Sequence, residues 1–368
     1  MSRFGKNRRV FFFEEPIFED AVEPHLRTQT CPQTGIYVLA PVLPRGLDKV
    51  QINSLQRDLL NSLLKENNIQ DYIAWYYTPT AMEFTSAFDP KLTVYDCMDE
   101  LSAFSGAPPS MRDNEQALFR QAQLVFTGGK SLFEAKRKQH SSVYLFPSSV
   151  DVAHFQRARQ VREQPEDQRS IGKPRFGFAG VIDERMDIEL LRQVAKKRPD
   201  WQFVLLGPVV KINPATLPSA PNIHLLGMKS YADLPAYMSG WDVGVLPFAL
   251  NESTRFISPT KTPEYLAAGL RVISTPIRDV VTPYEQLGLV SIAENAQQFL
   301  EAGERLLIEG STPEFRERAD EFLRQSSWDQ TSSEMEKLME NKLLLDNSRD
   351  AHRRTVSVDS LAEGVRNV

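Results

Sequence analysis

A lysine and a glutamate stand three residues apart where the segment Trp241–Thr275 is expected to begin a helix. Thr262 can cap that helix, Pro263 suits its first position, and Lys261 comes directly before them. The first helical turn offers unpaired N–H groups and the positive end of the helix dipole, so an anion is favoured there. Glu264 lies in the same turn, where it either accepts hydrogen bonds from ribose hydroxyls or simply balances the dipole.

The same segment predicts the strands before and after this helical turn. Asp242–Pro247 is a short apolar run, typical of a strand buried on both faces of a parallel sheet. Gly269 can end the helix, and Arg271–Thr275 begins the next strand. Strand, polar loop, capped helix and strand in this order predict a nucleotide-diphosphate pocket at the junction of loop and helix.

Further candidates for the pocket lie on either side of this segment. Gly180 ends an expected strand, and a phosphate could approach its backbone closely, although a simple turn would use a glycine equally well. Arg185 either binds phosphate together with Lys261 or pairs with Asp183 or Asp187 near a helix start. The remaining donor-site candidates are loop residues. Lys211 follows the next strand, and Thr254 and Ser258 lie before Lys261, where these two could contact sugar hydroxyls.

Acidic residues follow the expected strand Leu92–Tyr95, at the edge where open α/β sheets bind ligands. Asp96, Asp99 and Glu100 are therefore candidates for a general base, which makes a hydroxyl a better nucleophile by taking its proton. The alternative is that these acids cap the helix expected near Leu101.

A glycine turn is expected at the same edge. Gly128 and Gly129 either bound an acceptor or a diphosphate, or form a plain entry into a helix capped near Ser131. Across both halves of the chain, short apolar runs alternate with helical patterns, which indicates parallel α/β sheets. The expected strands are 10–13, 34–40, 72–77, 92–95, 124–126, 143–146, 175–180, 203–206, 223–226, 242–247 and 271–275, with a polar linker at 157–173.

Composition narrows the class of protein. A chain of 368 residues with 41% hydrophobic and 25% charged residues is long enough for two globular domains. The net charge of −5 argues against a general nucleic-acid binder. Cys31 and Cys97 form neither a disulfide framework nor a zinc-ligand pattern. Val10–Phe13 is too short for a signal-peptide core or a membrane span, so we expect a cytoplasmic protein.

Two basic clusters leave an alternative open. The segments 3–9 and 136–138 are either solvated faces or contacts to anionic lipid headgroups. In the second case the protein would lie peripherally at the inner face of the membrane.

Taken together, residues 241–275 resemble the carboxy-terminal signature of GT-B glycosyltransferases, in which a glutamate at a helix start holds the ribose of a nucleotide sugar. In the commonest version two glutamates are separated by seven residues; Glu264 with Ala267–Val272 matches the second, and Phe256 occupies the first position. The segment is closer to a subgroup of glycosyltransferase family 4, the group 1 superfamily, with a Pro-x-Lys-x-x-Glu-Tyr-Leu-Ala-Ala-Gly motif, here 259–269. Residues 146–151, Phe-Pro-Ser-Ser-Val-Asp, resemble the segment that closes the first domain of these enzymes.

The resemblance implies an α/β fold with two Rossmann-like domains facing across a cleft, the GT-B arrangement. It implies an acceptor-side domain at 1–160, a donor-binding domain at 161–325, a helix at 326–346 that crosses back to the first domain, and a flexible tail at 347–368. Arg185 resembles one of two cations that hold the diphosphate, while Val181 occupies the position of the other. Because inverting relatives use an aspartate in the first domain, Asp99 is the first choice for the base and Asp96 the second.

The implied activity is transfer of a sugar from a nucleotide-diphosphate sugar, UDP-linked, to a saccharide or lipid-linked saccharide in surface or exopolysaccharide synthesis. The resemblance implies no cofactor and no metal, with cations and the helix dipole stabilising the leaving group. A nucleotide-sugar epimerase of the same fold and a non-catalytic nucleotide-sugar-binding subunit are the alternatives. A dehydrogenase is disfavoured because Gly177–Gly180 lacks the G-x-G-x-x-G spacing.

Overall fold

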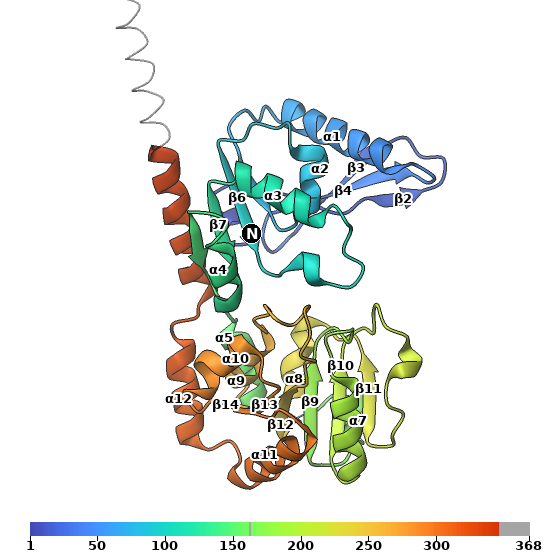
Figure 1. Cartoon of the computed structure of the whole chain (residues 1–368), viewed down its shortest axis with the longest axis vertical. Coiled ribbons are helices and arrows are strands. Elements are labelled where there is room, and N and C mark those ends of the chain that lie inside the picture. The colour runs from blue at the N-terminus through green and yellow to red at the C-terminus, as the bar shows by residue number, and fades with distance from the viewer. Residues whose placement is uncertain (162, 346–368) are drawn as a thin grey trace, which may run out of the picture. The chain divides into compact units, whose positions relative to one another are not determined.

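The computed structural model describes residues 1–161 and 163–345, and these form two compact units (Figure 1). Unit 1 contains Met1–Asp96, Pro109–Val125 and the chain from Asp329 onward, and unit 2 contains Cys97–Pro108 and Phe126–Trp328. This division differs from the predicted domain boundaries, because residues 97–108 and 126–160 are grouped with unit 2. The predicted tail 347–368 lies outside the described residues.

Unit 1 contains a small sheet in the order β1-β4-β2, with β3 against β4. Strands β1 (Phe11–Phe13) and β2 (Ile17–Glu19) pair in parallel with β4 (Tyr37–Pro44), and β3 (His25–Thr30) pairs antiparallel to it. The prediction that this strand ends at Pro41 was wrong, since β4 continues to Pro44. Strands β2 and β3 were not predicted, because residues 17–30 are mostly polar and show no clear apolar alternation.

A second sheet has the order β5-β6-β7-β8. Strand β5 (Ile73–Tyr76) is parallel to β6 (Leu92–Cys97), and β7 (Leu124–Thr127) and β8 (Val143–Leu145) follow. Because β6 runs two residues beyond its predicted end, Asp96 lies inside the strand and not after it.

The helices of unit 1 are α1 (Lys49–Glu66), α2 (Met82–Thr85) and α3 (Met111–Gln121), together with the helical residues 329–345 at the described end of the chain. Helix α1 begins with a capping box, in which Asp48 accepts from the Gln51 N–H and the Gln51 side chain accepts from the Asp48 N–H. The terminal helix is tied to the start of the chain by ion pairs, Arg3 with Asp329 at 2.9 Å and Arg8 with Glu336 at 3.2 Å.

Unit 2 is built on a parallel six-stranded sheet in the order β11-β10-β9-β12-β13-β14 (Figure 1). Strands β9 to β13 confirm the predicted α/β pattern, with bounds shifted by one or two residues, whereas β14 was not predicted. The six strands are β9 (Arg175–Ala179), β10 (Gln202–Leu206), β11 (Ile223–Gly227), β12 (Val243–Leu246), β13 (Arg271–Ser274) and β14 (Val290–Ile292).

Both faces of this sheet are covered by helices. Alternate strand residues separate into two hydrophobic clusters, Phe203 and Leu205 of β10 in one, Val204 and Leu206 in the other. Helices α7 (Ile188–Lys197) and α11 (Ala296–Glu309) belong to the first cluster; α5 (Val152–Gln156), α8 (Leu234–Met238), α9 (Lys261–Ala267) and α12 (Pro313–Leu323) belong to the second. A sheet covered on both faces explains why its strands are apolar throughout and do not alternate.

The polar stretch 157–173, predicted as a linker, is packed into unit 2. It forms a short 3-10 helix (Arg157–Arg159) and α6 (Glu166–Arg169). The Arg159 guanidinium binds the Asp320 carboxylate at 2.7 Å and also donates to the Ala267 carbonyl at 2.8 Å. The stretch 157–173 is therefore polar because its side chains form hydrogen bonds to neighbouring elements.

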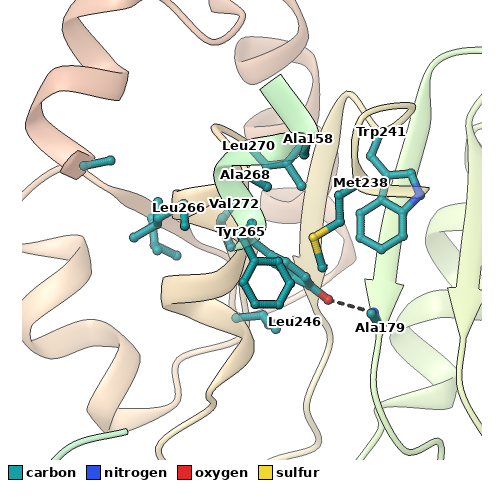
Figure 2. Packing of buried hydrophobic residues seen from close by; sticks show 14 of the residues in the cluster. Ala158, Ala179, Met238, Trp241, Leu246, Tyr265, Leu266, Ala268, Leu270 and Val272 are labelled. Atoms are coloured by element: carbon teal, nitrogen blue, oxygen red, sulfur yellow. Dashed lines mark hydrogen bonds between the residues drawn. The ribbon is translucent and has the colours of Figure 1, made fainter. Parts of the chain in front are cut away.

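One hydrogen bond ties the predicted motif helix to the central strand. Figure 2 shows the Tyr265 hydroxyl of α9 accepting from the Ala179 N–H at the end of β9, at 2.7 Å. The Tyr265 side chain is completely buried, its ring packs edge-on against Trp241, and a Cβ at Gly244 would lie 2.7 Å from it. Glycine at 244 thus makes room for the tyrosine ring.

We expect Tyr265→Phe to lower the free energy of unfolding by about 1–3 kcal/mol, because the buried Ala179 N–H loses its acceptor. Urea denaturation measures this loss. Tyr284→Phe is the matched control, since the Tyr284 hydroxyl has no hydrogen bond among the described residues. Equal stability of the two variants would contradict a structural role for the Tyr265 hydroxyl.

Candidate nucleotide-sugar site

The motif helix begins slightly earlier than predicted. Helix α9 starts at Lys261, with Thr260 at the N-cap position and no side-chain cap. The prediction that Thr262 caps the helix was wrong: it lies inside α9, and its buried hydroxyl has no hydrogen-bond partner in the described structure. Because α9 has only seven residues, anion binding at this point depends mainly on side-chain charge.

Lys261 and Glu264 form an ion pair on the first turn of α9. The Lys261 Nζ lies 2.7 Å from the Glu264 Oε2, and the two side chains are 25% and 12% exposed. Burial raises the pKa of the Glu264 carboxyl, and the Lys261 ammonium opposes that shift. Glu264 is thus a mostly buried hydrogen-bond acceptor, and Lys261 beside it is a partly exposed cation.

The bond from Tyr265 to Ala179 brings this pair to the end of β9. Glu264 precedes Tyr265 in the chain and Gly180 follows Ala179, so the carboxylate and the glycine flank one hydrogen bond. Gly180 donates to the Leu206 carbonyl at 2.9 Å, and a Cβ at Gly207 would lie 1.8 Å from the Gly180 oxygen. Gly207 has a φ of +139°, so this close approach of two backbones requires glycine there.

Arg185 is held by Asp183. Its Nε and Nη2 donate to both carboxylate oxygens at 2.7–3.1 Å, which is one of the pairings that the sequence left open. Hydrogen bonding to Asp183 raises the pKa of the Arg185 guanidinium. The Nη1 group has no hydrogen-bond partner among the residues described, so it remains available to a ligand.

An aromatic residue that the sequence analysis missed lies beside two of the donor-site candidates. The Phe104 ring lies 5.4 Å from the Arg185 guanidinium carbon and 5.9 Å from the Lys211 Nζ. Lys211 is exposed and has a φ of +60°. The ring therefore brings the two cations into one neighbourhood within unit 2. Phe104 gave no signal in sequence because it lies in an irregular loop.

Hydrogen bonds within the loop between β12 and α9 hold its conformation. The Thr254 hydroxyl contacts the Ala249 carbonyl and accepts from the Asn251 N–H at 3.0 Å. Thr254 is 2% exposed, so in this conformation its hydroxyl orders the loop. Ala249 in turn donates to the Arg185 carbonyl at 2.8 Å, which joins the loop to the arginine segment. Ser258 is half-buried near the end of the loop.

The two candidate bases have different surroundings. Asp96, in unit 1, is 6% exposed; one carboxylate oxygen accepts from the Trp75 indole N–H at 3.2 Å, and the other has no partner in the described chain. Asp99, in unit 2, is only half-buried and makes no side-chain hydrogen bond that the described residues show. Burial raises the pKa of each carboxyl to about 6, opposed chiefly by the Trp75 hydrogen bond for Asp96 and by Arg185 for Asp99.

The alternative that these acids cap a helix is not what the structure shows. Glu100 stands before the 3-10 helix Leu101–Ala103 and makes no cap hydrogen bond. Its carboxylate binds the buried Lys136 ammonium at 2.7 Å and accepts from the Ser102 hydroxyl at 2.8 Å. Glu100 thus has a structural role, and Asp99 is the accessible acid of this segment.

The glycine turn holds a carboxylate that the sequence analysis missed. Gly129 precedes α4 (Lys130–Lys136), and Ser131, predicted near the cap, lies inside that helix. The Asp279 carboxylate accepts from the Ser131 N–H at 3.0 Å, and a Cβ at Gly129 would meet it at 2.2 Å. Gly128 donates to the Cys97 carbonyl at 3.1 Å. The turn thus makes room for Asp279, which was unpredictable because it lies 148 residues from Ser131 in the chain.

In the described part of the chain, no group of three or more His, Cys, Asp or Glu residues is arranged to hold a metal ion. None of the described helices is both long enough and apolar enough to cross a membrane.

Comparison with solved structures defines the fold. Sucrose-phosphate synthase from Thermosynechococcus elongatus superposes with a TM-score of 0.67 at 15% identity, covering 92% of this chain and 90% of that one. HepE of Anabaena, solved in complex with UDP and glucose, gives a TM-score of 0.62 at 15% identity, covering 84% and 87%. The protein has the GT-B glycosyltransferase fold.

Sequence comparison narrows the class further. Residues 173–309 match the family model described as glycosyl transferases group 1, and this range holds every donor-site candidate named above. A putative teichuronic acid biosynthesis glycosyltransferase of Bacillus subtilis, TuaH, is 24% identical over 275 residues, which cover 69% of this chain and 68% of that protein. Residues 173–309 are thus similar to group 1 glycosyltransferases, and the whole chain has the fold of glycosyltransferases.

We expect Lys261→Gln to weaken binding of a nucleoside diphosphate by roughly 10- to 100-fold, the value of one charge-assisted hydrogen bond. Glutamine still donates to Glu264, so binding of the nucleoside alone should change little. Isothermal titration with UDP and with uridine measures both. Lys196→Gln, on an exposed position of α7, is the control. An equal loss for both ligands would mean that the substitution had damaged the pocket and had not removed a phosphate contact.

Proposed function

We propose that the protein transfers a sugar from UDP-sugar to a saccharide, or to a lipid-linked saccharide, in the synthesis of a surface or exported polysaccharide. The observation that carries this proposal is the Lys261–Glu264 pair at the end of β9, where a carboxylate suited to ribose hydroxyls stands beside a cation suited to phosphate. The UDP bound to HepE and the polysaccharide in the name of TuaH support the choice of donor and pathway.

The ion pair gives a simple account of donor binding. In the structure Lys261 and Glu264 satisfy one another. When the nucleotide binds, the Lys261 ammonium moves to the diphosphate and Glu264 accepts from the ribose hydroxyls, so neither charge stays buried without a partner. The Arg185 Nη1 and the Lys211 Nζ supply further positive charge. These cations stabilise the leaving diphosphate without a metal ion in this proposal.

Asp99 is the proposed general base. The acceptor hydroxyl oxygen attacks the anomeric carbon, the bond from that carbon to the diphosphate oxygen breaks, and the hydroxyl proton passes to the Asp99 carboxylate. A carboxyl with a pKa of about 6 suits this role, because it is ionised near neutral pH and still accepts a proton readily. The Arg185 guanidinium beside it favours the ionised form.

We expect UDP to stabilise the protein by roughly 2.7 kcal/mol at about 100 times its dissociation constant, with or without magnesium. Thermal denaturation in buffer containing a chelator measures this. Uridine at the same concentration is the control, since it lacks the diphosphate. If no nucleoside diphosphate shifted the melting temperature under either condition, the proposed donor site would be wrong.

We expect Asp99→Asn to lower kcat by about 10²- to 10⁴-fold with little change in UDP affinity, as for loss of a positioned base. The wild-type rate should fall as pH drops below about 6, because the base becomes protonated.

The pH profile alone cannot identify the acid, because the pKa of Asp96 is also about 6. Asp96→Asn is therefore the comparison variant, and its rate should stay within a few-fold of wild type. A collapse in Asp96→Asn with a normal rate in Asp99→Asn would assign the base to Asp96. A mild effect of both would indicate front-face transfer, in which the leaving phosphate accepts the proton.

A further inference from the structure

Unit 1 contains a large cavity that the donor site does not use. Its volume is about 1080 Å³, and every residue that lines it belongs to unit 1. Its walls come from β1, β5, α1 and the helical residues 329–345. The cavity is partly open to solvent, and its volume is slightly above the usual range of about 300–1,000 Å³ for small-molecule pockets.

The cavity lies along the open edges of two sheets. Strand β1 ends the sheet β1-β4-β2, strand β5 ends the sheet β5-β6-β7-β8, and both line the cavity. Phe12 and Tyr77 face each other with ring centroids 6.3 Å apart, and they are 36% and 41% exposed. Large aromatic surface therefore remains accessible on the walls.

The wall has a polar part and a larger apolar part. Its charged residues are Arg8, Arg9, Glu14, Glu15, Asp71 and Lys91, and most of the others are apolar or aromatic. The polar atoms of three wall residues are already used by the protein: the Trp75 indole donates to Asp96 at 3.2 Å, the Tyr76 hydroxyl to Thr85 at 2.9 Å, and the Thr85 hydroxyl to the Ala81 carbonyl at 2.7 Å. Sugar hydroxyls buried there would lose hydrogen bonds to water without replacement, whereas an apolar chain would not.

Positive charge borders the cavity where the chain enters β1. Arg8 and Arg9 both line it, and Arg8 is paired with Glu336 at 3.2 Å. Arg9 is exposed and contacts the Phe11 ring at 5.8 Å, and it has no ion pair within the described part of the chain. Glu14 and Glu15 also line the cavity, and Lys91 in its wall is paired with Asp71 at 3.3 Å. Arg9 therefore remains as a counter-charge for an anionic group attached to an apolar chain.

We propose that this cavity binds the apolar chain of an amphiphile whose phosphate headgroup contacts Arg9. This assignment rests on the proposed function: the amphiphile is the carrier of the acceptor saccharide, so the acceptor is lipid-linked. We propose a single bound molecule, and not a membrane surface, because the lining residues of β1, β5 and α1 surround one cavity.

The test uses the whole chain, dodecyl phosphate below its micelle concentration, and no nucleotide sugar. A dodecyl phosphate brominated on its chain should quench tryptophan fluorescence saturably, because Trp75 lines the cavity. Trp75→Phe should abolish this quenching and Trp328→Phe should retain it, since Trp328 is not part of the lining. Quenching that persists in Trp75→Phe would place the chain elsewhere and overturn the proposal.

A second pair of variants tests affinity by competition with a fluorescent fatty-chain probe. Phe12→Asp should weaken dodecyl phosphate binding at least tenfold, whereas Leu225→Asp, a similarly exposed strand position outside the cavity, should not. Arg9→Gln should weaken dodecyl phosphate several-fold and leave an uncharged dodecyl ether unaffected. Equal behaviour of Phe12→Asp and Leu225→Asp would contradict the proposal.

Two further outcomes would also overturn the assignment. Binding to anionic vesicles alone, unchanged by Phe12→Asp, would indicate a surface contact. Displacement of the probe by an oligosaccharide and not by dodecyl phosphate would make the cavity a saccharide site. Thermal stabilisation by UDP, measured on the same variants, separates this proposal from the donor site: it should be unchanged in Phe12→Asp, and its absence in every variant would count against the proposed function instead.

Discussion

The hydrogen bond from the Ala179 N–H to the Tyr265 hydroxyl positions the candidate donor site, because it holds the start of α9 at the end of β9. Strand β9 sits in the middle of the six-stranded sheet, and Tyr265 is buried on the face that also holds Trp241 and Leu246 (Figure 2). The residues on either side of this bond, Gly180 and Glu264, are those with proposed roles toward the donor. The packing of the buried Tyr265 against the sheet thus determines where the neighbouring Glu264 carboxylate lies.

The charges at the site are paired before any nucleotide binds. Lys261 is bound to Glu264 and Arg185 to Asp183, so a diphosphate competes with one carboxylate for each cation. In the proposed binding mode, Lys261 leaves Glu264 for the diphosphate, and Glu264 then accepts from the ribose hydroxyls. Asp183 is 7% exposed and has no comparable new partner, so we propose that Arg185 stays bound to it and contacts the ligand through Nη1. In this proposal Lys261 moves and Arg185 stays in place.

The fold and the motif could be predicted from the sequence, but the contacts between distant segments could not. Buried parallel strands such as β9 and β12 are short apolar runs bounded by glycine or proline, which is why they were predictable. Strands β2 and β3 are polar, and their pairing with β4 depends on tertiary context. The choice between Asp183 and a phosphate for Arg185 could not be made from spacing, since both partners suit the guanidinium. Asp279 and the cavity in unit 1 depend on segments far apart in the chain.

The central claim is that Lys261 and Glu264 separate to hold the two halves of a nucleotide diphosphate. A crystal structure of the protein with UDP tests it most directly. The account predicts ribose hydroxyl oxygens within hydrogen-bonding distance of the Glu264 carboxylate, diphosphate oxygens on the Lys261 Nζ, and the 2.7 Å contact between the two side chains broken. UDP bound with that ion pair intact, or bound away from the end of β9, would contradict it.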